Sequence, residues 1–272
     1  MEITALSADA SMTGSLVTTI CLNVVAACFV VVRVIDTCGR RNRRLLIDDM
    51  LSLLALFLLI CYSTLTYTML YALQKLNKSV LDIGYMIQQD IILTYVSGFT
   101  MYFSKTPILV LYLRIFGIKT WVRLITYATL ALSSVSFLTS FVVVGAICTH
   151  RAEVGDVTLL GKCLMTTIQA GVANGSTAVI TDIIIIILPL PIIASLSLPL
   201  RKKIGLAIIF LTGVLAIAAS VVSLYFKLLS LTGHTTAFIA TLFCTVIECS
   251  LAIMVGCTPA VRACWSKYAK NT

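Results

Sequence analysis

Charged side chains are scarce in this chain of 272 residues. Asp, Glu, Lys and Arg together make up 11% of it, whereas hydrophobic residues make up 60%. Soluble domains carry about 25% charged residues. So low a content excludes an ordinary water-soluble domain and predicts a protein of the lipid bilayer.

Histidine is scarcer still, and no cysteine or histidine has the spacing of a metal site. The two histidines, His150 and His234, lie in different predicted loops. Zinc sites need three or four such ligands close together. No cofactor motif is present either, so we expect neither a metal nor a cofactor.

Long apolar runs, in contrast, occupy most of the sequence. A membrane-spanning helix needs about 20 apolar residues. Seven windows are long enough: 15–33, 50–72, 91–113, 123–147, 167–195, 204–228 and 236–258. The expected fold is therefore all-α, a polytopic seven-transmembrane-helix bundle. Its expected parts are an outer N-terminal segment at 1–14, the transmembrane domain at 15–258 and a short cytosolic tail at 259–272.

The net charge of +9 is a topology signal. Most of the 20 lysines and arginines fall in predicted loops on one side of the membrane. The positive-inside rule assigns that side and the C-terminus to the cytosol, and the N-terminus to the outside. No nucleic-acid partner is expected. The predicted location is the endoplasmic reticulum, another endomembrane or the plasma membrane.

Two features belong to the predicted outer loops. Cys148 and Cys163 flank one such loop, and an oxidising compartment allows disulfides. We expect these two cysteines to form a disulfide. The triplet "NKS" at Asn77 is a glycosylation acceptor pattern in another outer loop.

Three ionisable residues, Lys105, Asp182 and Glu248, lie near the predicted middle of the membrane. A charge there costs about 2.5–3.5 kcal/mol on insertion scales, so such residues face the bundle interior and pair. Two carboxylates against one lysine leave a surplus negative charge, which favours the protonated form of one carboxyl. A neutral acid beside an anion can act as a general acid and base. Lys227 is expected to snorkel to the outer membrane surface instead.

Other side chains share helical faces with these three charges. The candidate ligand-binding residues on those faces are Tyr95, Tyr102, Asn174 and Thr245. Two interpretations stay open. The polar residues bond the helices to one another in lipid, or they line an aromatic-walled pocket that opens outward. In the second case Glu248, Asp182 and Lys105 form the catalytic floor of the pocket.

A retinal pigment needs a lysine for its Schiff base, which opsins carry on the seventh helix. The seventh window, 236–258, contains no lysine. Retinal is therefore not expected as a partner. The expected partners are the lipid bilayer and a lipophilic small molecule.

Several motifs in this order resemble the fungal rhodopsin-like integral membrane family. They are "DDMLSLLALFLLI", "SKTPILVLYLRIF", the Cys148–Cys163 loop, and "ANGSTAVITDIIIIILPLP" followed by "RKK". The resemblance implies a seven-helix bundle that generally binds no retinal. The family contains candidate surface receptors and many proteins encoded beside secondary-metabolite enzymes. The matching positions are Asp49, Lys105, Cys148, Cys163, Asn174, Asp182, Glu248 and Pro259, whereas Ala178 replaces an asparagine common in the family.

Two functions follow from these observations. The first is a cofactor-free cyclase or isomerase, or an accessory protein, of polyketide or terpenoid biosynthesis, with carboxylate acid–base chemistry. The alternative is a surface sensor resembling a G-protein-coupled receptor, in which the same pocket binds a signal. A transporter is less favoured because the inverted repeats of many transporter folds are not visible.

Overall fold

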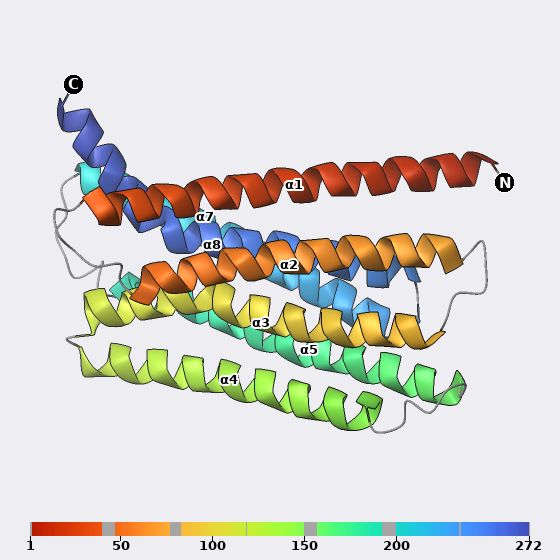
Figure 1. Ribbon diagram of the computed structural model, residues 1–272. Coiled ribbons are helices and arrows are strands. Elements are labelled where there is room, and N and C mark those ends of the chain that lie inside the picture. Colours follow the sequence, from red (N-terminus) through yellow and green to blue (C-terminus); the bar gives the residue numbers. More distant parts are fainter. Residues whose placement is uncertain are drawn as a thin grey trace.

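The computed structural model describes residues 2–39, 47–76, 83–117, 119–149, 157–191, 200–233 and 235–271. Within these ranges the chain forms seven long helices and no strand (Figure 1). They are α1 (Glu2–Gly39), α2 (Ile47–Leu76), α3 (Ile83–Phe116), α4 (Thr120–Thr149), α5 (Val157–Ile187), α7 (Leu200–Ser230) and α8 (Thr235–Asn271). The predicted all-α bundle is confirmed.

The helices are longer than most of the predicted windows. Helix α1 begins at Glu2 and so includes the segment at 1–14 that we expected outside the first span. Helix α8 continues through Pro259 to Asn271, and in Figure 1 its last turns lead away from the bundle. Only the window 167–195 overruns its helix, because α5 ends at Ile187, just before Pro189. Asn77, the predicted glycosylation site, lies outside the described residues.

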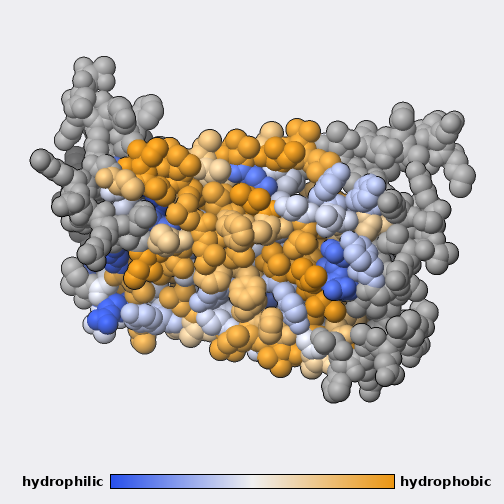
Figure 2. All heavy atoms as spheres, in the orientation of Figure 1, coloured by the Kyte–Doolittle hydropathy of each residue, from blue (hydrophilic) through white to orange (hydrophobic). Residues whose placement is uncertain are grey.

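Six of the described helices are long and apolar enough to cross a membrane: α1, α2, α4, α5, α7 and α8. Large apolar side chains point outward along them, among them Val24, Phe57, Leu138, Val142 and Val221. Figure 2 shows such hydrophobic residues over much of the middle of the visible face. This surface suits lipid rather than water, and the chain is an integral membrane protein.

Helix α3 is not among these six and, like α8, is enclosed by four other helices. It packs against α2, α4, α5 and α8, whereas α1 contacts only α2 and α8 among the described helices. Helix α3 can therefore carry polar side chains, such as the buried Thr100, Ser104 and Lys105, that lipid would not tolerate. Its partners α2, α4, α5 and α8 cover these polar residues.

At the end predicted to face outward, Cys148 of α4 and Cys163 of α5 form a disulfide, with their Cα atoms 5.2 Å apart. Both cysteines are buried against Val144 and Ala170. The bond joins the two helices on either side of residues 150–156, so the ends of α4 and α5 are held together there.

Candidate functional site

Four charged side chains lie in the bundle centre, and three of them, Lys105, Asp182 and Glu248, form one cluster. The Nζ atom of Lys105 donates to Asp182 Oδ2 of α5 at 2.8 Å and to Glu248 Oε1 of α8 at 3.3 Å. It also donates to the backbone oxygen of Ala178 at 2.9 Å. All three residues are at most 5% exposed. The structure thus brings together the three intramembrane charges that the sequence singled out.

The fourth charge is Lys227 of α7, and the expectation that it snorkels outward is wrong. The residue is 4% exposed, and its Nζ atom lies 3.8 Å from Glu248 Oε2 and 3.8 Å from Met101 Sδ. Helix α7 packs between α5 and α8, so this face of the helix meets protein and not lipid. Gly175 of α5 makes room, since a Cβ atom there would lie 3.0 Å from Lys227 Cδ.

Lys227 changes the charge balance of the site. Two lysines now face two carboxylates, so the predicted surplus negative charge is wrong. Ser220, on the same face of α7, donates to Asp182 Oδ2 and, at 3.2 Å, to Glu248 Oε1. The sequence interpretation overlooked α7, although its polar residues at helical spacing were a usable signal: Ser220, Ser223, Lys227 and Ser230.

The two lysines differ in how far their donors are used. An ammonium has three N–H groups, and those of Lys105 have three oxygen acceptors. Among the described residues, Lys227 has only the sulfur of Met101 as a hydrogen-bond acceptor and the longer pair with Glu248. Glu248 Oε2 accepts no hydrogen bond from the described residues. Lys227 and Glu248 Oε2 are therefore the two groups of the site whose hydrogen-bonding capacity is not fully used.

Lys227 also lines a cavity of about 70 Å³ between α2, α3, α5, α7 and α8, which we call the main cavity. Its polar lining residues are Tyr62, Asp90, Thr94, Ser97, Thr167, Asn174, Lys227, Ser230, Thr241 and Thr245. Asn174 and Thr245 are the two predicted ligand-binding residues in this lining. A water molecule needs about 10–15 Å³ of such space, so the main cavity has room for a few waters or a slim ligand.

A second cavity of about 40 Å³ lies between α3, α4 and α5 and is lined by Tyr102, Lys105 and several hydroxyl side chains. Met101 and Asn174 line both cavities and so separate them. The Asn174 side-chain oxygen accepts from Ser136 at 2.9 Å and from Ser140 at 3.2 Å. Three of the four predicted ligand-binding residues, Tyr102, Asn174 and Thr245, are thus divided between two neighbouring cavities.

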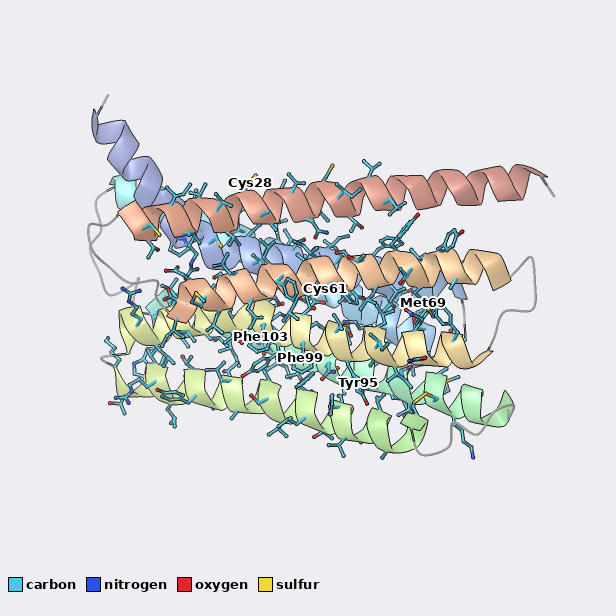
Figure 3. All side chains as sticks on the ribbon, in the orientation of Figure 1. Cys28, Cys61, Met69, Tyr95, Phe99 and Phe103 are labelled. Atoms are coloured by element: carbon cyan, nitrogen blue, oxygen red, sulfur yellow. A yellow bond between two sulfur atoms is a disulfide. The ribbon has the colours of Figure 1, made fainter. Side chains whose placement is uncertain are left out.

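The aromatic residues of α3 form most of their contacts with α4. Figure 3 labels Tyr95, Phe99 and Phe103 along α3, and the first two of these rings contact rings of α4. The Tyr95 ring centroid is 4.4 Å from that of Phe141, and the Phe99 centroid is 4.5 Å from that of Phe137. Tyr95 lines neither cavity. The aromatic lining of the main cavity comes from α2 and α8 instead, through Tyr62 and Phe238.

A separate ionic network lies at the end predicted to face the cytosol. Arg33 of α1 donates to Asp49 Oδ1 at 2.8 Å, to Asp48 Oδ2 at 2.7 Å and to the backbone oxygen of Gly256 at 2.7 Å. The two aspartates lie in the first turn of α2, where their charge suits the helix N-terminus. Arg33 is the last residue of the predicted window 15–33, and the sequence did not indicate that it pairs with them in a buried network.

A model of the fungal rhodopsin domain matches residues 32–267, which is most of the chain. The match includes both ionic networks and both cavities. No curated protein and no solved structure matches the chain.

Proposed function

The chain belongs to the fungal rhodopsin domain family, and on that premise we propose that its main cavity binds a slim lipophilic molecule with a carbonyl or carboxylate group. In this proposal the protein is a cofactor-free isomerase or cyclase of polyketide- or terpenoid-like compounds. The site residues are Lys227 and Glu248, with Lys105 and Asp182 as positioning residues.

The proposal rests on one observation. The ammonium group of Lys227 lies at the cavity wall and lacks oxygen acceptors for its full set of hydrogen bonds. Lys227 is 4% exposed, yet the nearest carboxylate oxygen is 3.8 Å from its Nζ atom. A buried charge without full hydrogen bonding is costly, so a ligand oxygen that accepts from Lys227 would be stabilising. The surrounding Leu93, Ile168 and Phe238 would cover the apolar part of the ligand.

The same geometry supports acid–base chemistry. Lys227 donates to a ligand carbonyl oxygen and thereby makes the neighbouring C–H group more acidic. Glu248 lines neither cavity as they stand, so its Oε2 atom, 3.8 Å from Lys227 Nζ, reaches a ligand once the main cavity has widened toward it. It then removes that proton and returns it to another carbon, while the double bond shifts, so the product has the mass of the substrate. Lys105 and Ser220 hold the other oxygen of Glu248, at 3.3 and 3.2 Å. A substrate of this class requires the main cavity to widen, since pockets for drug-sized ligands measure about 300–1,000 Å³.

The test is a metabolite comparison by liquid chromatography and mass spectrometry in the source organism with and without the gene. We expect one compound to disappear and an isomer of the same mass to accumulate. Wild-type chain restores the compound, whereas Glu248→Gln and Lys227→Met do not, at equal amounts of folded protein. Tyr95→Phe is the matched control, because Tyr95 lines neither cavity. An unchanged profile in the deletion strain overturns the enzyme proposal.

A second candidate, a receptor-like sensor, is favoured by helix α8. Glu248 in the central site and Gly256 in the Arg33 network lie on this one helix, about 12 Å apart at 1.5 Å per residue. Movement of α8 on ligand binding would therefore alter the Arg33 contacts at the other end. A fluorescent label on Cys38 in a variant without the other free cysteines would report this movement when ligand is added.

A further inference from the structure

We propose that Asp90 forms a cation subsite in the main cavity, at the end opposite Lys227. It takes a monovalent cation or the protonated amine of an organic ligand. The inference deepens the proposed function and rests on it in one respect: with Lys227 at the other end, the preferred ligand has a cationic group at one end and a carbonyl or carboxylate at the other.

Asp90 is a buried carboxyl group without a cationic partner in the described part of the chain. It is 6% exposed, and Thr167 donates to its Oδ2 atom at 2.9 Å. No lysine, arginine or histidine among the described residues forms a salt bridge with it. Asp182 is buried to the same degree, at 5% exposed, but pairs with Lys105 at 2.8 Å. A buried carboxylate is costly unless it is paired, so the space beside Asp90 suits a cation.

The position of Asp90 in the main cavity supports this role. Asp90 and Met101 both line it from α3 and lie about 16 Å apart along the helix axis, at 1.5 Å per residue. Met101 Sδ is 3.8 Å from Lys227 Nζ, so the two charged groups mark the two ends of the cavity. Between them Thr94, Ser97 and Thr241 add hydroxyl groups. A space this narrow and this long favours an unbranched ligand with a polar group at each end.

The experiment measures the Tm of the purified full chain in lipid nanodiscs while the cation is changed at constant ionic strength. N-methyl-D-glucamine chloride, whose cation is too large for the main cavity, is replaced stepwise by sodium chloride or by propylammonium chloride. We expect a saturable rise in Tm with at least one of the two. Asp90→Asn is expected to lose that rise, whereas Thr126→Val, a change at a buried polar residue that lines neither cavity, keeps it.

The outcomes separate the two sources of the cation and the two proposals. A rise with both salts means that an inorganic ion suffices, and a rise with propylammonium alone assigns the subsite to an amine. Lys227→Met should keep the rise, so a failure of the Lys227 proposal leaves this inference standing. No rise with either salt, or an equal rise in Asp90→Asn, overturns it. If Asp90→Asn does not fold, Thr167→Val replaces it, and an unchanged half-saturating concentration in that variant overturns the inference.

Discussion

The two buried ionic networks of this protein are built from similar groups but differ in how completely they are paired. In the Arg33 network all three guanidinium nitrogens donate at 2.7–2.8 Å, to two carboxylates and one backbone oxygen. In the central site Lys105 uses all three of its N–H donors, whereas Lys227 lies beside a cavity and 3.8 Å from its carboxylate partner. The first arrangement suits a clamp between α1, α2 and α8. The second suits binding, because its remaining hydrogen bonds are available to a ligand.

The largest effect on stability is expected from breaking the fully hydrogen-bonded Arg33 network. Arg33→Met leaves Asp48 and Asp49 buried without their main partner, and removing one member of a buried ion pair costs about 3–5 kcal/mol. We expect most of the protein to be lost from the folded fraction in size-exclusion chromatography of detergent extracts. Arg123→Met is the control, since Arg123 is exposed at the start of α4. Equal folded yields for both variants would show that the Arg33 network is not a clamp.

The two central lysines offer a sharper version of the same comparison. Lys105→Met removes the three hydrogen bonds that the ammonium group donates to oxygen atoms. The free energy of unfolding should fall by about 3–5 kcal/mol, as expected for a broken buried ion pair. Lys227→Met removes one longer ion pair, and Glu248 keeps Lys105 as a partner, so the loss should be smaller, about 3 kcal/mol or less. Thermal unfolding in nanodiscs measures both. A larger loss for Lys227→Met would mean that Lys227 is the structural lysine of the pair.

The smallest effect on stability is expected at Gly175, with a larger effect on binding. In Gly175→Ala the added Cβ lies 3.0 Å from Lys227 Cδ and 3.4 Å from its Nζ, so the lysine has to shift. Alanine in a helix gains about 0.5–1 kcal/mol over glycine, which offsets the crowding. We expect a near-normal Tm but loss of the compound in the metabolite assay. Gly161→Ala is the matched control on α5, because a Cβ there meets nothing within 4 Å. Normal metabolite levels in Gly175→Ala would argue against a role for the Lys227 position.

The fold was predictable because a bilayer demands long apolar helices, and six such helices stand out by length and composition. The pairing of Lys105 with Asp182 and Glu248 was predictable for the same reason, since charges at that depth need partners. The inward orientation of Lys227 was not, because the rotation of an apolar helix about its axis depends on its neighbours. Likewise, Arg33 falls at the edge of its apolar window, and only the packing of α8 shows that it is buried.

Met101 has a consequence for the range of molecules that this protein can accept. Its side chain forms part of the wall between spaces of about 70 and 40 Å³. Methionine is unbranched and has three rotatable bonds, so it changes rotamer easily. A different Met101 rotamer would join the two spaces and open a path from Lys227 toward Tyr102 and the hydroxyl groups facing α4. The size of the ligand that the proposed site admits would then depend in part on the torsion angles of one thioether.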